Sequence, residues 1–209
     1  MSESIQGLKP GQARVKRVFD FSLGLLGLIL VGWLIWLLAL LARLDTGQSG
    51  FFRQERIGYE GKPFQVIKIR TMRPVEGVTT TVTHAKDSRI TGIGGFLRRT
   101  KLDELPQLIS IVRGEMSFVG PRPDVPGFAD RLQGHDRLLL TVRPGMTGPA
   151  TLKYRHEEAL LAEQVDPDLF NREVLFPEKV KVNVAYVENW SFKKDLLYIW
   201  KTVTGSSEV

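Results

Sequence analysis

The sequence predicts a mainly helical α+β protein. A membrane-inserted N-terminal helix precedes a compact, membrane-associated domain with a small β-hairpin and interfacial amphipathic helices. Three features of the 209-residue chain support this fold class. A long uncharged apolar run lies near the N-terminus, a turn at residues 59–62 separates two β-rich runs, and helical patterns recur from residue 103 onward.

The apolar run covers residues 21–42 and contains no charged side chain. At ~1.5 Å per residue, a straight helix of this length would be about 33 Å long, enough to cross the hydrocarbon of a bilayer. A helix in a soluble core rarely stays apolar on every side, as this one does around Trp33 and Trp36. The run is longer than a signal-peptide core and no small-residue cleavage site follows it, so we expect the helix to be retained.

Basic residues flank this run on both sides, which leaves two topologies open. Arg14, Lys16 and Arg17 precede it, and Arg43, Arg53 and Arg56 follow it. Because basic flanks prefer the cytoplasm, the helix either crosses the bilayer against one flank or dips into one leaflet and returns. Gly32, in the middle of the run, is the candidate position for a bend.

The remainder of the chain predicts a hairpin followed by helices. The segment FFRQERIGYEGKPFQVIKIRTM has β-rich runs around the turn at residues 59–62, and residues 74–86 predict a loop. Helical patterns then lie at about 103–112, 155–164, 178–189 and 193–203. Connectors rich in proline and glycine, GEMSFVGPRPDVPG and RPGMTGPA, lie between them.

The last helical pattern admits two interpretations. It places Leu196, Leu197, Trp200 and Val203 at helical spacing, with lysines at positions 193, 194 and 201. Such a helix either lies in the headgroup region of a membrane or packs one amphipathic face onto the core.

The composition favours an anionic partner. The formal net charge is +6 and the isoelectric point is about 9.6, which suits nucleic acid, an anionic lipid surface or phosphorylated small molecules. The chain has no cysteine, which excludes disulfides, thiolate nucleophiles and cysteine-based zinc sites.

Asp103 and Glu104 lie side by side in RRTKLDELPQLISIV and admit a structural and a chemical interpretation. Thr100 and Asp103 match a capping box, and Pro106 is tolerated in a first turn, so a helix is expected to begin around residues 100–103. The dipole of that helix and cations such as Arg98 would keep a carboxylate there ionised. An ionised aspartate is a competent nucleophile toward phosphorus, while its neighbour, facing another direction, can meet a metal.

Candidate phosphate-binding residues come from three other segments. VIKIRTM contributes Lys68 and Arg70, and RPGMTGPATLKYR contributes Arg155. GPRP holds Arg122 between Pro121 and Pro123, whose fixed φ angles restrain where the guanidinium points. Each of these residues, taken alone, is also typical of a solvated surface.

Other familiar motifs are absent from the sequence. TGIGG is not followed by Lys-Ser or Lys-Thr, so it is not a P-loop. The three histidines have no metal-ligand spacing, and no G-x-S-x-G elbow indicates a hydrolase triad.

Five segments together resemble the bacterial sugar transferase family, the small monotopic polyprenyl-phosphate phosphoglycosyl transferases. In chain order they are KRVFDFSLGLLGLIL, FFRQERIGYEGKPFQVIKIRTM, DSRITGIGGFLRRTKLDELPQL, VRGEMSFVGPRP and VRPGMTG. They cover roughly residues 16–148, and several rare strings recur in one order, which makes the resemblance specific.

The resemblance implies a reaction and roles for the carboxylates. Such enzymes move a sugar 1-phosphate from a UDP-sugar to polyprenyl (undecaprenyl) phosphate and release UMP, as the first membrane step of exopolysaccharide or surface glycoconjugate synthesis. Asp103 matches the nucleophile, which forms a covalent phospho-sugar intermediate. Glu104 assists it, and Mg²⁺ bridges both carboxylates and the diphosphate.

The resemblance also places the basic candidates. Lys68, Arg122 and Arg155 fall where the family binds phosphate or nucleotide, and we group Arg70, Pro121 and Pro123 with them as substrate-binding residues. The string GPATLKYR departs from the family's commoner Gly-Arg ending before Arg155.

A location and partners follow from the same resemblance. Residues 1–45 would form the basic segment and a re-entrant membrane helix, and residues 46–209 a phosphoglycosyl transferase domain on the cytoplasmic face of the bacterial inner membrane. The family bends this helix at a Ser-Pro pair, whereas this chain has Gly32-Trp33, so a straighter helix is the alternative. Expected partners are the UDP-sugar, the polyprenyl phosphate and membrane lipids, but not nucleic acid; a homo-oligomer stays open.

Two rival functions remain. A glycosyltransferase that moves only the sugar would release UDP rather than UMP. A membrane-anchored scaffold without activity would bind nucleotide sugar weakly, although the intact Asp-Glu pair argues against it. Nucleic-acid binding fits poorly, because the basic residues accompany a membrane anchor rather than an aromatic RNA platform.

Overall fold

The computed structural model describes residues 7–74 and 87–206, so the loop predicted at residues 74–86 lies almost wholly outside the described residues. The α-helices are α1 (Pro10–Thr46), α2 (Gly92–Arg99), α3 (Gln107–Arg113), α4 (Pro149–Lys153), α5 (Glu157–Ala162), α6 (Pro167–Phe170), α7 (Phe176–Glu188) and α8 (Phe192–Thr204). The strands are β1 (Phe51–Ile57), β2 (Pro63–Ile69), β3 (Ser117–Val119) and β4 (Gly145–Thr147). The predicted class, mainly helical α+β with an N-terminal apolar helix, is confirmed.

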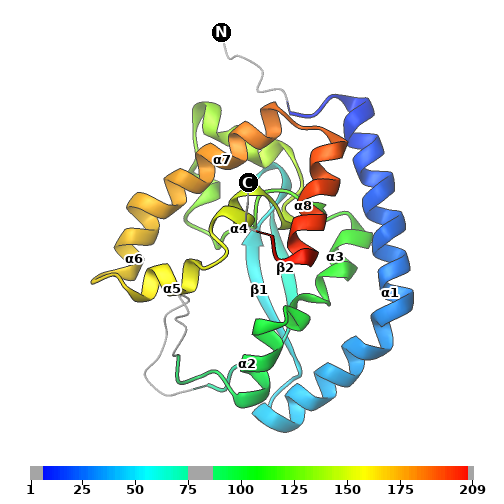
Figure 1. Cartoon of the computed structure of the whole chain (residues 1–209), viewed down its shortest axis with the longest axis vertical. Helices are drawn as coiled ribbons and strands as arrows, with labels where there is room; N and C mark the ends of the chain where they lie inside the picture. Colours follow the sequence, from blue (N-terminus) through cyan, green and yellow to red (C-terminus); the bar gives the residue numbers. More distant parts are fainter. Residues whose placement is uncertain (1–6, 75–86, 207–209) are drawn as a thin grey trace.

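Short 3₁₀ and π turns connect these elements. The 3₁₀ turns are η1 (Tyr59–Gly61), η2 (Leu102–Glu104), η3 (Ala129–Arg131) and η4 (Gly134–Thr141), and a π-helical turn, η5 (Asn171–Leu175), precedes α7. Figure 1 shows α1 along one side of the molecule, α3 between α1 and the β1–β2 hairpin, and α5 and α6 on the opposite side.

Helix α1 is the single element among the described residues that is long and apolar enough to cross a membrane. Its 37 residues correspond to about 55 Å, longer than the hydrocarbon of a bilayer. The helix is continuous through Gly32, and Figure 1 shows it bending toward the domain in its C-terminal part. Near the middle, the Trp33 indole donates a hydrogen bond to the Leu30 carbonyl at 3.0 Å.

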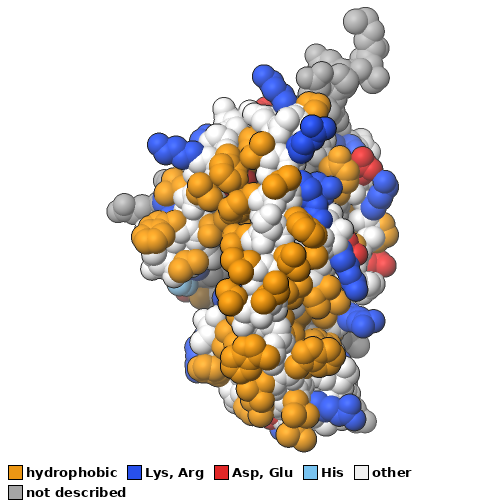
Figure 2. All heavy atoms as spheres, turned by 90° about the vertical axis from the view of Figure 1, so that its right-hand side faces the viewer, with side chains coloured by type: hydrophobic (Ala, Val, Ile, Leu, Met, Phe, Trp, Pro, Cys, Tyr) orange, Lys and Arg blue, Asp and Glu red, His pale blue; other side chains and the backbone are white. Residues whose placement is uncertain are grey.

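The outward face of α1 is apolar and exposed. Figure 2 shows a band of hydrophobic side chains along it, with Lys and Arg at the margins. Ile29, Trp33 and Trp36 are each about 70% exposed, which a helix in water would not favour. This face therefore matches a helix in lipid.

The inward face of α1 packs on the rest of the chain along its whole length. Near its start, Lys16 forms a buried ion pair with Asp195 of α8, and Arg17 donates to the carbonyls of Ile111 and Val112 at 2.6 and 2.7 Å. Near its end, a second group of α1 side chains shares a core with β2 and α2, and this group is Ile35, Leu38, Ala39 and Ala42.

The predicted hairpin is confirmed as antiparallel strands β1 and β2 around η1. Phe52 lies opposite Lys68, Gln54 opposite Val66 and Arg56 opposite Phe64. Because directly opposed residues share a face, these six side chains lie on one side of the hairpin. Val66 in the middle is buried against α3, so this face is turned toward the segment that carries the carboxylates.

A second sheet was not predicted. Strands β3 and β4 are three residues each and pair in parallel, Ser117 with Gly145 and Val119 with Thr147. The pair brings the two proline- and glycine-rich connectors side by side, and the Gly145 N–H donates to the Pro121 carbonyl at 2.8 Å. This contact fixes the beginning of the Pro-Arg-Pro segment.

The helical patterns near the C-terminus are confirmed as α5, α7 and α8, with bounds that differ by a few residues. In α8, Asp195 is buried and Tyr198 and Ile199 pack on the main core. The apolar quartet singled out in the sequence is exposed: Leu196, Leu197, Trp200 and Val203. Thus α8 presents one face to the core and a second, apolar face to its surroundings.

The prediction of a capping box at residues 100–103 is wrong. Thr100 instead follows α2, and its hydroxyl donates to the carbonyls of Phe96 and Leu97 at 2.9 and 3.2 Å. Helix α3 begins at Gln107, directly after Pro106. The missed helix α2 explains the difference, because Thr100 is used to close that helix rather than to open the next one.

Candidate active site

Asp103 and Glu104 lie in η2, between α2 and α3. Lys101 has the left-handed backbone conformation (φ 58°), which turns the chain sharply after α2. Both carboxylates are 6% exposed, so the turn carries two adjacent acids into the interior. Burial of two like charges is unfavourable unless cations or a ligand compensate them.

Two cations compensate Glu104. The Lys68 ammonium from β2 and the Arg122 guanidinium both donate to Glu104 Oε1, at 3.1 and 2.7 Å. Burial alone would raise the pKa of Glu104, but the charges of Arg122 and Lys68 outweigh it and hold that pKa well below its usual range. The Glu104 charge in turn raises the pKa of Arg122, while burial lowers the pKa of Lys68.

Asp103 has a different environment. Its Oδ1 atom is buried and has no hydrogen-bond partner among the described residues. Burial, followed by the Glu104 charge, raises the pKa of Asp103, and the charges of Lys68 and Arg98 offset this in part. Helix α3 begins at Gln107, so Asp103 does not lie at the helix start where the dipole was expected to act, while the nearby cations act on its pKa in the expected direction.

The carboxylates fit a divalent cation in part. Mg²⁺ prefers oxygen ligands, takes one or two carboxylates and completes its shell with water and substrate phosphate. The unpartnered Asp103 Oδ1 is an oxygen atom of the kind that Mg²⁺ prefers, and Glu104 is adjacent. No group of three or more potential metal-binding side chains occurs within the described part of the chain, so these two acids would need ligands from the substrate.

The structure brings Pro121, Arg122 and Pro123 to the carboxylates as one segment. Both prolines are buried, and only the arginine between them extends to Glu104. The prolines therefore act through the backbone, which they restrict on either side of Arg122.

Arg70 lies apart from the carboxylates. Its guanidinium donates to the carbonyls of Ser49 at 2.7 Å and Phe51 at 3.4 Å, and it lies over the ring of Phe52. These contacts brace the connection between α1 and the hairpin, so in this structure Arg70 has a role in the fold.

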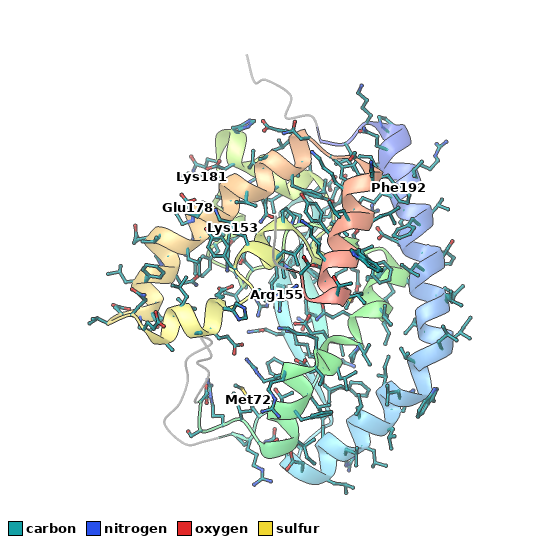
Figure 3. The ribbon with its side chains drawn as sticks, in the orientation of Figure 1. Met72, Lys153, Arg155, Glu178, Lys181 and Phe192 are labelled. Atoms are coloured by element: carbon teal, nitrogen blue, oxygen red, sulfur yellow. The ribbon has the colours of Figure 1, made fainter. Side chains whose placement is uncertain are left out.

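Arg155 also has backbone partners. It donates to the carbonyls of Gly205 and Lys201, at the C-terminal end of α8, and Figure 3 shows its side chain beside that end. A cation is favourable there because the last carbonyls of a helix carry partial negative charge. The structure does not join Arg155 to Glu104 or Asp103.

Five further charged residues lie around the site, and none of them was a predicted site residue. Arg98 at the end of α2 pairs with Glu158, and Lys179 of α7 pairs with Glu157 at 2.6 Å. The adjacent glutamates thus attach α5 to α2 and to α7. Burial raises the pKa of Asp124, which follows the Pro-Arg-Pro segment, to about 6. Separations of 22 to 60 residues explain why local patterns did not reveal these pairs.

This arrangement can perform nucleophilic chemistry on an anionic substrate. It combines one buried carboxylate oxygen without a partner, an adjacent carboxylate fixed by two cations, and a position beside a helix with an apolar outer face. Lys68 and Arg122 can neutralise charge on phosphate oxygens, the main requirement of phosphoryl transfer.

Comparison with known proteins identifies a family. A family model described as bacterial sugar transferase matches residues 11–207. The exopolysaccharide production protein ExoY of Sinorhizobium fredii is 33% identical over 204 residues, which cover 90% of this chain and 83% of that protein.

Two further relatives have more specific names. The UDP-glucose:undecaprenyl-phosphate glucose-1-phosphate transferase of Escherichia coli is 34% identical over 195 residues, which cover 90% of this chain but 39% of that longer protein. The putative undecaprenyl-phosphate N-acetylgalactosaminyl 1-phosphate transferase of Bacillus subtilis is 40% identical over 120 residues, covering 57% of this chain and 67% of that protein. With the match over nearly its whole length, the chain belongs to the bacterial sugar transferase family.

Proposed function

We propose that the protein transfers a sugar 1-phosphate from a UDP-sugar to undecaprenyl phosphate, releasing UMP, at the start of exopolysaccharide or glycoconjugate assembly. The observation that carries this proposal is the buried Asp103 oxygen without a partner, beside a glutamate held by Lys68 and Arg122. The names of the relatives, which include sugar-1-phosphate transferases and ExoY proteins, support the same reaction class.

In the first step, an Asp103 carboxylate oxygen attacks the sugar-bearing phosphorus of the donor. The bond from this phosphorus to the oxygen that bridges it to UMP breaks, and UMP leaves with that oxygen. Asp103 then carries the phospho-sugar as an acyl phosphate. Because its burial beside Glu104 disfavours the ionised form, a deprotonated Asp103 is a more basic and more reactive nucleophile than an exposed aspartate.

In the second step, a phosphate oxygen of the lipid acceptor attacks the same phosphorus. The Asp103–phosphorus bond breaks, which regenerates the carboxylate and gives the polyprenyl-diphospho-sugar. Covalent capture divides the reaction in two, so that a soluble donor can leave before a lipid acceptor enters.

The side chains around Asp103 position and neutralise the phosphates. Glu104 holds Lys68 and Arg122 beside Asp103, and both cations can face phosphate oxygens as charge develops on them. When bound through Asp103 and Glu104, Mg²⁺ would supply additional neutralisation of the diphosphate.

We place the enzyme on the cytoplasmic face of the bacterial inner membrane, with α1 dipping into one leaflet. Support comes from the contacts of α1 with one and the same domain near its start, through Lys16 and Arg17, and near its end, through Ala39 and Ala42. A straight span would carry one of these ends away from the domain. The exposed apolar face of α8 is a second candidate lipid contact.

The test combines product analysis with one substitution. Purified protein with a panel of UDP-sugars, undecaprenyl phosphate and Mg²⁺ should release UMP with at least one donor, and donor alone should give a phospho-sugar adduct on Asp103 in mass spectra. Asp103→Asn should reduce turnover at least about a thousandfold and abolish the adduct, because the amide is a poor nucleophile. Asp136→Asn, at an exposed aspartate, is the matched control.

Two results would contradict this proposal. Release of UDP in place of UMP would indicate transfer of the sugar alone. Lipid-linked product from Asp103→Asn at the wild-type rate would show that Asp103 is not the nucleophile.

A further inference from the structure

Arg122 reaches Glu104 from a segment without regular secondary structure, so contacts with neighbouring elements must hold it in place. Residues 120–125 have neither helical nor strand conformation. The flanking prolines restrict the segment's φ angles but do not attach it to a neighbouring element. The Gly145 N–H fixes the segment before Arg122 through the Pro121 carbonyl, so the position of the guanidinium also depends on what binds the backbone after Arg122.

The end of β1 binds this backbone at two consecutive carbonyls. Arg56 Nη1 donates to the Pro123 carbonyl at 3.1 Å, and the Ile57 N–H donates to the Asp124 carbonyl at 2.8 Å. The second bond needs only a backbone N–H, which any residue except proline supplies. The first bond depends on the Arg56 side chain.

Gln54 fixes the orientation of this side chain. Its Oε1 accepts from Arg56 Nε at 3.2 Å and from Arg56 Nη2 at 2.6 Å, while Nη1 is directed to Pro123. The planar guanidinium is thus held along two edges, by one acceptor on its own strand and one on the Pro-Arg-Pro segment. A lysine ammonium has no such fixed fork.

The charge of Arg56 is not used in an ion pair. No salt bridge to Arg56 is found in residues 7–74 and 87–206, and its hydrogen-bond acceptors are a neutral amide and a neutral carbonyl. Burial lowers the pKa of Arg56 to about 10, and the Arg122 charge acts in the same direction. The charges of Asp124 and Glu104 act in the opposite direction on this pKa, and the directed hydrogen bonds fix where the guanidinium lies.

The hairpin register connects Arg56 to Lys68. Both residues lie on the same hairpin face, four residue pairs apart, or about 13 Å at ~3.3 Å per residue. At one end of this face Lys68 contacts Glu104 directly. At the other end Arg56 holds the segment through which Arg122 contacts the same Glu104 oxygen. The same hairpin thereby determines the positions of both cations, Lys68 directly and Arg122 through Arg56.

We propose that Arg56, oriented by Gln54, is a positioning residue for the transfer reaction: it anchors the Pro121–Asp124 backbone so that Arg122 stays on Glu104 beside the nucleophile. The proposal rests on the proposed function for its kinetic consequence. It assigns Arg56 no contact with the substrate, and its whole effect passes through Arg122.

The experiment measures adduct formation in a single turnover at saturating UDP-sugar. Arg56→Gln should slow this step about 10- to 100-fold, the range expected when a charged group is misplaced by about an ångström. Arg56→Lys should slow adduct formation to a similar extent, because a lysine ammonium keeps the charge but cannot donate to Gln54 and Pro123 in the same planar geometry. Arg53→Gln, which removes an exposed arginine from the same strand, should remain within about twofold of wild type.

A double-mutant cycle separates positioning from a general structural role. If Arg56 acts through Arg122, the pair Arg56→Gln and Arg122→Gln should be no slower than Arg122→Gln alone. Multiplied defects, or an Arg56→Gln rate equal to that of Arg53→Gln, would overturn the proposal. If Arg56→Gln does not fold, Gln54→Met frees one edge of the guanidinium and should slow the same step, and a wild-type rate for Gln54→Met would then overturn it.

These outcomes are distinct from failure of the proposed function. If the protein were not a phosphoglycosyl transferase, the wild type itself would form no adduct with any donor. If only the positioning role is wrong, wild type forms the adduct, and either Arg56→Gln forms it equally fast or the Arg56→Gln and Arg122→Gln defects multiply.

Discussion

Asp103 and Glu104 are adjacent and equally buried, yet their surroundings shift their pKa values in opposite directions. Glu104 has two cations on one oxygen, whereas Asp103 has a buried oxygen with no partner among the described residues. The opposite pKa shifts fit the proposed roles, in which Glu104 holds the two cations and Asp103 is the nucleophile. The direction of each pKa shift is set by burial and by the charged residues that surround each side chain in the fold, and not by the type of the acid.

Asp124 gives a pH-dependent prediction at the same scale. Burial raises its pKa to about 6, so between about pH 4 and pH 6 the folded protein retains a proton that the unfolded chain has lost. The free energy of unfolding therefore falls as pH rises through this window. Asp124→Asn cannot ionise, and it should exceed wild type in stability by about 1–3 kcal/mol at pH 7 but by little at pH 4.

Chemical denaturation in detergent micelles at the two pH values measures this difference. Asp130→Asn, at an exposed aspartate nearby in the chain, should show no such pH-dependent gain. Parallel stability curves for wild type and Asp124→Asn from pH 4 to pH 7 would contradict the raised pKa.

The connection between α1 and β1 determines how the hairpin meets the membrane helix. Gly47 ends α1 in the left-handed conformation, and its N–H donates to the Arg43 carbonyl at 2.9 Å. The chain then returns so closely along α1 that a Cβ on Gly50 would lie 1.8 Å from the Ala39 carbonyl oxygen. Only glycine fits, because the Ala39 backbone leaves no room for a side chain.

Gly50→Ala should consequently separate the hairpin from α1. We expect a loss of about 1–3 kcal/mol in stability, the usual cost of overpacking, with a lower thermal midpoint in detergent. Gly92→Ala is the matched control, since a Cβ there meets nothing within 4 Å, and its midpoint should stay near that of wild type. An unchanged midpoint for Gly50→Ala would show that the close approach is not required.

The molecule as a whole holds both ends of its membrane helix. Lys16 and Arg17 attach the start of α1 to α8 and α3, and the core formed with β2 and α2 attaches its end. The bend seen in Figure 1 lets one helix satisfy both sets of contacts without proline. Basic flanks on both sides are then compatible with a single cytoplasmic compartment.

Cysteine labelling tests this topology directly, because the chain has no cysteine of its own. Gly11→Cys and Gln48→Cys place single thiols at exposed positions before and after the apolar run. A membrane-impermeant maleimide should label neither in intact spheroplasts and both in inverted inner-membrane vesicles. Labelling of one site in each preparation would establish a straight span and contradict the dip.

Local patterns predicted much of the fold because they depend on residues close in sequence. The uncharged run at residues 21–42 predicted the core of α1, alternation around residues 59–62 predicted the hairpin, and helical spacing predicted α7 and α8. Helix α2 was missed because its glycine-rich beginning resembles a loop, and with it the role of Thr100. The β3–β4 pair was missed because its strands have three residues each.

The sequence by itself determined a membrane helix, a hairpin and an Asp-Glu pair among basic residues. Only the tertiary structure decided which basic residues serve that pair: Lys68 and Arg122 contact Glu104, while Arg70 and Arg155 bind backbone carbonyls elsewhere. The physical reason is the distance along the chain over which each interaction acts. Helical and strand periodicity is set by neighbours along the chain, whereas an ion pair across 18 or 36 residues exists only where packing brings two surfaces together.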